Sequence, residues 1–139
     1  DRYATPIPEA VDIGIFNAFP KDTELLQAPL ALVPLWSSPR PFLNEEATVV
    51  ITSASPEGLG WHTVLGPGTQ LAGRARPPTR WRNIVFSPHV NRWDVEAKFG
   101  PETNFCRTWP EVLDALERAH GGHARVAVFP AGALQMAAA

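Results

Sequence analysis

Apolar residues along the chain gather in short, nearly continuous runs that are separated by polar connections rich in proline and glycine. Four of these runs are rich in β-branched or aromatic residues, which favour strands. Apolar and polar residues do not alternate within them, so the pattern is typical of strands covered on both faces, as in a parallel sheet flanked by helices. We therefore expect strands over residues 12–18, 47–53, 83–87 and 124–130.

The clearest helix is predicted over residues 108–122, "TWPEVLDALERAHGG". Thr108 and Glu111 have the spacing of a capping box, Pro110 is tolerated in the first turn, and Gly121 supplies the stop. An apolar stripe at helical spacing should lie on the sheet. Its members are Val112, Leu113, Leu116 and Ala119.

A less regular helix is expected over residues 22–36, "DTELLQAPLALVPLW". Asp22 or Thr23 can cap its first turn through a side-chain oxygen. Pro29 has no amide hydrogen to donate to the preceding turn, so this helix should be kinked or interrupted. The connection over residues 55–81 has the composition of a loop, with room for one helical turn.

These elements predict a single α/β domain of Rossmann-like type, with a mostly parallel sheet of about four strands flanked by helices. Right-handed crossovers place the carboxyl ends of parallel strands at one edge of the sheet. Residues 19–22, 53–62 and 87–91 each follow a predicted strand. They should therefore gather at that edge, where open α/β sheets bind ligands.

Composition limits the classes of function. The 139 residues are about enough for one domain, and 12 basic side chains stand against 14 acidic ones. Without a basic stripe, nucleic-acid binding has no electrostatic basis. No stretch approaches the roughly 20 apolar residues of a membrane helix, and the N-terminus lacks the layout of a signal peptide.

Two features bear on the context of the chain. Cys106 is the single cysteine, which rules out an intrachain disulfide and fits a reducing compartment, so we expect a cytoplasmic location. The chain begins "DRYATPIPEA" with no initiator methionine, and we expect it to be a fragment of a longer protein.

The stretch "NAFPKDTELLQ" is the first site candidate, because it joins a predicted strand to a predicted helix. Lys21 can supply a cationic donor to a carboxylate or phosphate, and Asp22 lies beside the positive end of the helix. The plain alternative is that Asp22 is only a helix cap and Lys21 a solvated loop residue.

The second candidate is "SASPEGLGWH", residues 53–62, which offers the carboxylate of Glu57, the imidazole of His62 and two glycines for tight turns. A phosphate-binding loop can have this composition. The dinucleotide fingerprint, however, requires a third glycine and an immediate helix, which this stretch lacks. A turn-rich crossover is the alternative.

Other reactive side chains form no clear pattern. His120 and His123 have H-x-x-H spacing, but glycines lie between them and no third ligand is near, so a polar turn is favoured over a metal site. His89 follows a predicted strand and is able to carry a proton. Cys106 has no activating neighbour and no G-x-S-x-G motif occurs, so nucleophilic catalysis is unsupported.

The order of these motifs resembles the C-terminal domain of the nickel-dependent lactate racemase family. "VDIGIFNAFPKDTELLQAPLAL" resembles the strand, Pro-x-Asp turn and glutamine-containing helix that open that domain, and "ATVVITSASPEGLG" resembles its next strand and Glu-Gly-x-Gly turn. "NIVFSP", "TWPEVLDALERAHGG" and "ARVAVFP" follow in the family's order. The likeness covers nearly the whole chain and is strongest over residues 11–60.

The resemblance implies a two-domain isomerase with a cleft between its domains. Family members interconvert stereoisomers of 2-hydroxy acids with a nickel pincer cofactor bound covalently to a lysine, and a hydride leaves the substrate carbon and returns to either face. The lysine, the nickel-binding histidine and the acid/base histidines belong to the N-terminal domain. The expected partners of this chain are then its own N-terminal domain and a small 2-hydroxy acid, with no nucleic acid and no membrane.

Carried over to this sequence, the resemblance implies that Lys21 contacts the substrate and that six residues face the cofactor or substrate. They are Phe19, Lys21, Asp22, Gln27, Glu57 and Gly58. Phe19 stands where the family often has a tyrosine, and it lacks the hydroxyl. Trp81 or Trp93 can replace an aromatic residue that the family brings from a longer helical connection.

Two interpretations from other classes remain. One is a stand-alone Rossmann-like module that binds a nucleotide at residues 57–62. The other is a structural docking domain whose tryptophan-edged face meets a neighbouring domain. The five tryptophans, at 36, 61, 81, 93 and 109, mostly flank loops, which suits core edges or an interdomain surface.

Overall fold

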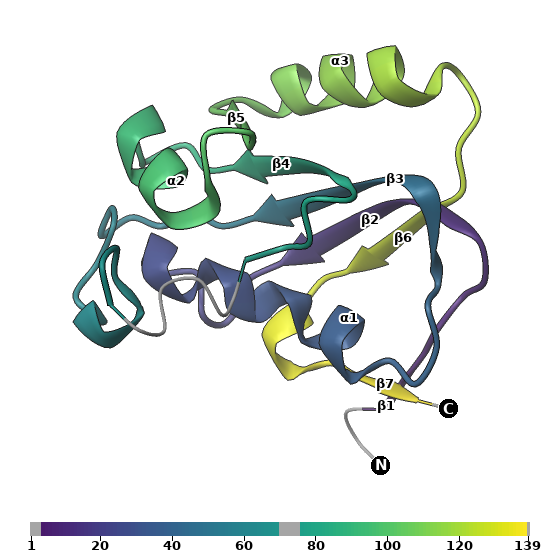
Figure 1. Ribbon diagram of the computed structural model, residues 1–139, viewed down its shortest axis with the longest axis horizontal. Helices are drawn as coiled ribbons and strands as arrows, with labels where there is room; N and C mark the ends of the chain where they lie inside the picture. The colour runs from purple at the N-terminus through teal and green to yellow at the C-terminus, as the bar shows by residue number, and fades with distance from the viewer. Residues whose placement is uncertain (1–3, 70–75, 139) are drawn as a thin grey trace.

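Five parallel strands form the central sheet of the computed structural model, which describes residues 4–69 and 76–138 (Figure 1). The spatial order is β5-β4-β3-β2-β6. The strands are β2 (Val11–Asn17), β3 (Leu43–Thr52), β4 (Arg82–Phe86), β5 (Asn104–Cys106) and β6 (Val126–Phe129). The predicted α/β fold is confirmed, and the four predicted strands are β2, β3, β4 and β6. The sequence pattern does not predict β5, because three residues are too few to show a periodicity.

The strand order reverses at β2. On one side of it β3, β4 and β5 follow in chain order, while β6 pairs in parallel on the other side. Such a reversal is a topological switch point, and ligands of open α/β sheets bind at the carboxyl ends of the strands beside it. Residues 18–22 leave the sheet at this point.

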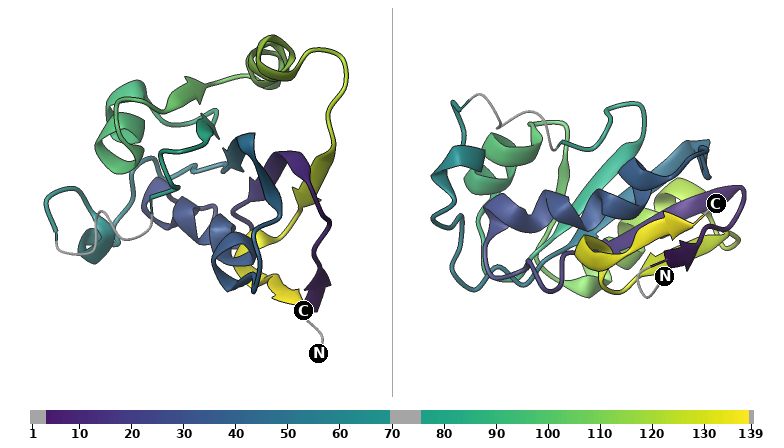
Figure 2. Two further views of the ribbon diagram at one scale, coloured as in Figure 1. Left: turned by 45° about the vertical axis from the view of Figure 1, so that its right-hand side comes forward. Right: turned by 90° about the horizontal axis from the view of Figure 1, so that it is seen from below.

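Helices cover both faces of the sheet (Figures 1 and 2). One face packs against η1 (Leu25–Leu32), α1 (Val33–Ser37) and α2 (Arg92–Phe99), and the other against α3 (Trp109–His120). The 3₁₀ turns η2 (Thr63–Leu65) and η3 (Gly132–Leu134) lie in loops. A separate two-stranded parallel ladder joins β1 (Ala4–Pro6) to β7 (Met136–Ala138).

The helix expected over residues 22–36 is interrupted, as predicted, but its start differs. It begins at Leu25 as a 3₁₀ helix that contains Pro29, and α1 follows directly. The prediction that Asp22 or Thr23 caps it is wrong, because Glu24 occupies the N-cap position and makes no side-chain cap. The reason is that the carbonyl groups of residues 22 and 23 pair with the turn after β3, which keeps the chain extended there.

The helix predicted over residues 108–122 is α3, and its capping box is present. The Thr108 side chain accepts from the N–H of Glu111, and the Glu111 carboxylate accepts from the N–H of Thr108 at 2.9 Å. Val112 and Leu116 are buried against the sheet as expected. Leu113 is exposed instead.

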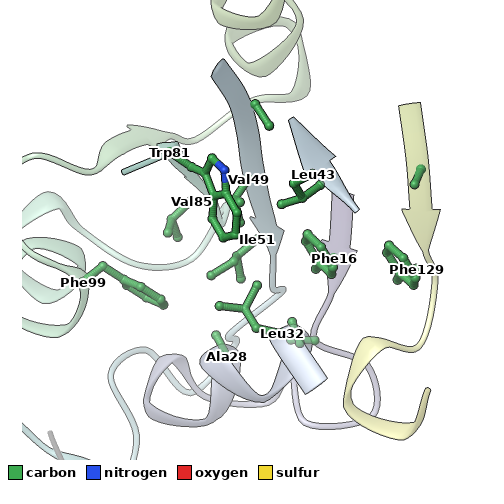
Figure 3. Packing of buried hydrophobic residues seen from close by; sticks show 14 of the residues in the cluster. Phe16, Ala28, Leu32, Leu43, Val49, Ile51, Trp81, Val85, Phe99 and Phe129 are labelled. Carbon is green, nitrogen blue, oxygen red and sulfur yellow. The ribbon is translucent and has the colours of Figure 1, made fainter. Parts of the chain in front are cut away.

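The larger core lies between the sheet and the η1, α1 and α2 side (Figure 3). Phe16 of β2 stacks on Phe129 of β6, with ring centroids 4.8 Å apart. Trp81 is buried at the edge of this core and donates its indole N–H to the carbonyl of Asn44 at 3.0 Å. The smaller core beneath α3 contains Cys106, whose pKa is raised by burial.

Candidate functional site

The turn after β2 and the turn after β3 lie against each other at the carboxyl edge of the sheet. Four backbone hydrogen bonds join them, two in each direction. They run from the N–H of Ser55 to Asp22 O (2.7 Å), Glu57 to Thr23 O (3.0 Å), Leu25 to Gly58 O (2.9 Å) and Leu26 to Leu59 O (3.1 Å). The prediction that these two segments converge is confirmed. The segment after β4 joins them, since the Ser87 hydroxyl donates to the carbonyl of Ala54 at 3.2 Å.

Gly60 allows the second turn to reach the first. Its φ is +96°, a conformation that residues with a side chain rarely adopt. A Cβ at this position would lie 2.5 Å from Cδ of Glu24 and would overlap other atoms of the same side chain. The second glycine of the Glu-Gly-Leu-Gly sequence is therefore needed here for close packing against Glu24.

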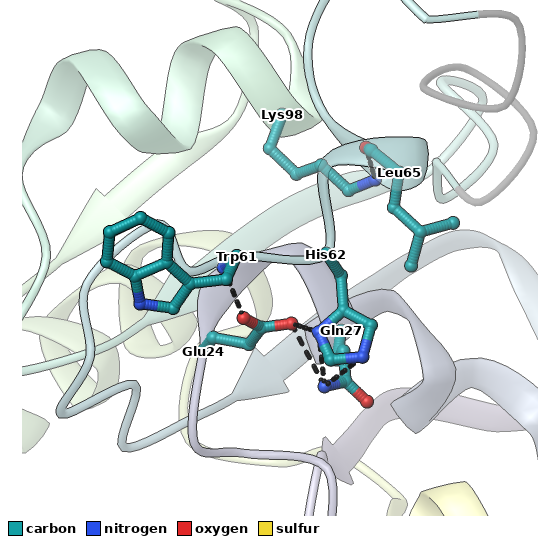
Figure 4. A network of polar contacts seen from close by, with 6 residues as sticks. All are labelled: Glu24, Gln27, Trp61, His62, Leu65 and Lys98. Carbon is teal, nitrogen blue, oxygen red and sulfur yellow. Dashed lines mark hydrogen bonds and ion pairs between the residues drawn. The ribbon is translucent and has the colours of Figure 1, made fainter.

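Glu24 is the centre of a polar network on this rim (Figure 4). Only 2% of the residue is exposed, and its carboxylate accepts hydrogen bonds from the N–H of Trp61 at 2.6 Å and from Nε2 of Gln27 at 2.9 Å. Nδ1 of His62 contacts the same carboxylate. Glu24 thus links the start of η1 to the end of the second turn.

The electrostatics of Glu24 follow from these contacts. Burial by itself would raise the pKa of this carboxyl group. The hydrogen bonds from Trp61 and Gln27, together with the charge and hydrogen bond of His62, outweigh burial and bring the pKa below its usual value. Glu24 is therefore an ionised carboxylate at neutral pH.

A buried ammonium group contacts the neighbouring loop. Lys98, near the end of α2, is 1% exposed and donates from Nζ to the carbonyl of Leu65 at 2.9 Å (Figure 4). Burial lowers its pKa, and the charge of Arg76 lowers it further. Lys98 holds the loop that follows His62 against α2.

The sequence-predicted site residues fall into two groups. Phe19, Lys21 and Glu57 are exposed on the rim, where a ligand or a partner can reach them, and Phe19 is 53% exposed. Asp22 and Gly58 contribute backbone groups to the hydrogen bonds between the turns. Gln27 is buried and directs its amide to Glu24 and His62 instead of the rim surface.

Sequence reasoning did not single out Glu24, and it noted His62 only as part of a weak candidate loop for which a turn-rich crossover was the alternative. The contact between Glu24 and Gln27 does have a signal in the sequence, because the two residues have the i, i+3 spacing of side chains that meet on a helix. The contact with His62 has no local signal, since it depends on the meeting of two turns 35 positions apart.

The two histidines of the H-x-x-H sequence, His120 and His123, have different surroundings. Nε2 of His120 lies 2.8 Å from the hydroxyl of Thr48, and His123 is exposed in the turn after α3. Across residues 4–69 and 76–138, no three histidine, cysteine or acidic side chains gather in a way that could hold a metal ion. Within the same residues, no helix is long and apolar enough to cross a membrane.

Comparison with known proteins identifies the fold of this chain. No protein-family model matches the sequence, and no curated protein matches it. Among solved structures, the lactate racemase apoprotein from Thermoanaerobacterium thermosaccharolyticum is similar over 99% of this chain, with a TM-score of 0.67 and 12% sequence identity. The fold is lactate racemase-like. This chain spans 37% of the length of that protein, and at 12% identity the likeness carries the fold alone, so function is argued from the site.

Proposed function

We propose that this chain is the lactate racemase-like C-terminal domain of a racemase or epimerase that acts on 2-hydroxy acids. In this proposal the rim formed by the turns after β2 and β3 is one wall of the substrate site, and a second domain provides the other. The observation that carries the proposal is the meeting of the Asp22 and Glu57 turns beside the switch point of this fold.

Lys21 is proposed to contact the substrate carboxylate. It is exposed, it lies in the turn after β2, and it is the one lysine or arginine within residues 17–24 and 53–62. Its backbone N–H donates to the carbonyl of Ala18 at 2.7 Å, so the turn that carries it is ordered. A charge-assisted hydrogen bond from this ammonium group would give both affinity and orientation.

Three aromatic side chains support a partner domain on this rim. Phe19 follows β2, Trp61 follows β3 and Trp93 lies at the start of α2 after β4. Phe19 is 53% exposed, and each tryptophan is 81% exposed. Aromatic residues are enriched in interfaces, so their exposure in the connections that follow three neighbouring strands suits a surface that another domain covers.

The described residues of this chain are not suited to hold the metal of the nickel pincer cofactor that the family resemblance implies. Phe19 offers a ring without a ligand atom, and the described residues gather no group of histidine, cysteine and acidic side chains that could hold a metal ion. We therefore assign nickel binding to the facing domain. Phe19, Asp22, Gln27, Glu57 and Gly58 are proposed to shape the wall opposite it.

The nucleotide-binding alternative is disfavoured by the same turn. Phosphate-binding loops present free N–H groups to the ligand. Here the N–H groups of Glu57 and Gly58 are bonded to backbone carbonyls, and that of Trp61 is bonded to the carboxylate of Glu24. A negative charge already occupies the anion position of this turn.

Replacement of Lys21 in the complete protein tests the proposal. Hydrogen bonds to charged groups contribute about 1.5–3 kcal/mol, so Lys21→Ala should raise KM for the 2-hydroxy acid by about 10- to 150-fold. Lys21→Arg should retain part of the affinity. Arg118→Ala, which removes an exposed cation from α3 on the far side of the sheet, is the matched control. An unchanged KM in Lys21→Ala would remove this role.

A further inference from the structure

β6 ends the sheet beyond β2 and leaves one of its own edges open. Among the residues that the structure describes, β6 pairs with β2 on one side, and no strand follows it on the other (Figure 1). An open strand edge presents backbone N–H and C=O groups that can pair with another strand. Proteins usually protect such edges with charged side chains or proline, and the sequence of β6, Val-Ala-Val-Phe, contains neither.

The pairing with β2 determines which backbone groups of β6 point to the open edge. The carbonyl of Arg125, directly before β6, accepts from an N–H of β2 at 3.2 Å. Successive residues of a strand direct their backbone groups to opposite sides, so Ala127, two positions on, also directs its groups to β2. The N–H and C=O groups of Val126 and Val128 therefore point away from β2, toward the open edge.

The side chains of the same two valines form an exposed apolar surface. Val126 is 49% exposed and Val128 is 59% exposed, while Ala127 between them is buried in the core on the other face of the sheet. Val126 lies beside Ile13 of β2, and Val128 lies beside Ile15. Parallel sheets are normally covered on both faces, so this apolar end of the sheet is suited to contact with another surface.

A second copy of β6 fits this edge, because the strand is symmetrical about Ala127. When two copies run antiparallel with Ala127 opposite its own copy, Val126 of each lies opposite Val128 of the other. The outward backbone groups of each such pair can exchange two hydrogen bonds. The four valines then lie on the same face, where cross-strand pairs of β-branched side chains stabilise the contact. Arg125 lies opposite Phe129, so no like charges face each other.

We propose that the open edge of β6 is a dimer interface, at which two copies of this chain pair antiparallel and join their sheets into one. Strands add beside β6 in the plane of the sheet, so the carboxyl edge that carries Lys21 stays accessible in each copy. The two rims point in opposite directions, because the strands of the two copies run antiparallel. The interface is thus compatible with a second domain on each rim, and it does not depend on the proposed function. The pairing of such short strands is small, so the dimer should depend on concentration.

Sedimentation velocity of the complete protein, at increasing micromolar concentrations, is the first test. The wild type should pass from monomer to dimer. Val128→Lys puts a charge on the edge at an exposed position, so it should leave the circular dichroism spectrum unchanged and raise the dissociation constant of the dimer about tenfold or more. Val64→Lys is the matched control, because Val64 is 56% exposed and lies in η2, and it should dimerise as the wild type does.

Two results of this measurement would overturn the proposal. One is a dimer with the same dissociation constant in the wild type and in Val128→Lys, which would place the interface elsewhere. The other is a monomer at every concentration, which would leave the edge of β6 to solvent or to another segment of the same protein.

Disulfide formation tests the register of the two strands. A mixture of Val126→Cys and Val128→Cys brings thiols directly opposite each other, with Cα atoms about 5.5 Å apart, within the range that a disulfide requires. Two copies of either variant alone place their thiols diagonally, roughly 7–8 Å apart. With copper phenanthroline as the oxidant, the mixture should therefore cross-link faster than each variant alone. The native Cys106 is buried and should not contribute. Equal rates in the mixture and in the separate variants would refute antiparallel pairing centred on Ala127.

Discussion

Replacement of Gly60 by alanine should destabilise the domain far more than replacement of Gly58. Both glycines have positive φ, +96° and +68° respectively, and both lie in the turn after β3. They differ in their surroundings. A Cβ at Gly58 would meet no atom within 4 Å, whereas a Cβ at Gly60 would overlap the Glu24 side chain and lie 2.5 Å from its Cδ.

The expected magnitudes follow from this difference. A left-handed conformation costs a residue with a side chain about 1–2 kcal/mol, which should be the whole effect in Gly58→Ala. In Gly60→Ala the carboxylate of Glu24 must also move away from the N–H of Trp61, and a hydrogen bond to a charged group contributes about 1.5–3 kcal/mol. The sum for Gly60→Ala is roughly 2.5–5 kcal/mol.

Urea unfolding followed by tryptophan fluorescence and circular dichroism measures both variants. The slope m, the dependence of the free energy of unfolding on urea concentration, should match that of the wild type. A change in the free energy of unfolding then reports a change in the native state. Losses of free energy in Gly60→Ala and Gly58→Ala that agree within about 0.5 kcal/mol, the usual effect of a surface substitution, would refute the close approach of Glu24 to this turn.

Three further predictions concern stability. Because the pKa of Glu24 is below its unfolded value of 4.5, its stabilising effect is present above pH 4.5 and is lost as the pH falls through the lower folded-state pKa. Urea unfolding across this range should show that the free energy of unfolding falls less steeply with decreasing pH in Glu24→Gln than in the wild type. An identical pH dependence in the two proteins would contradict this role of Glu24. Phe16→Ala should lower the free energy of unfolding by about 3–5 kcal/mol, because the fully buried ring stacks on Phe129, whereas exposed Phe19→Ala should have little effect; equal losses would contradict this packing. Thr108→Ala should cost about 1 kcal/mol through loss of the helix cap, and an unchanged midpoint would exclude that cap.

The predictable part of the fold is the part with strong local patterns. The strands β2, β3, β4 and β6 are continuous apolar runs, and α3 carries its own capping box. By contrast, α2 has a nearly even distribution of apolar residues and was not anticipated. Its cap is nevertheless present in the sequence, since the Asn91 side chain accepts from the N–H of Asp94 at 3.0 Å.

The candidate site also has a part that the sequence predicts and a part that it does not. Parallel topology was sufficient to bring the segments at residues 19–22 and 53–62 together, because all strand ends of such a sheet share an edge. The burial of Glu24 could not be predicted, since an acidic residue in a loop is usually solvated and only tertiary hydrogen bonds make its burial possible. The same long-range contact determines that Gln27 points inward and not to the rim.

The position of β2 in the sheet has a consequence for biosynthesis. β2 is an interior strand with β3 on one side and β6 on the other, yet β6 comes so late that Asp12 and Arg125, which are hydrogen-bonded at the start of the two strands, are 113 positions apart. At about 5–20 residues per second, roughly 6–23 s pass between their synthesis on the ribosome. During this interval one edge of β2 is unpaired and Phe16 lacks its stacking partner, so this part of the sheet and core cannot be completed before β6 has been synthesised.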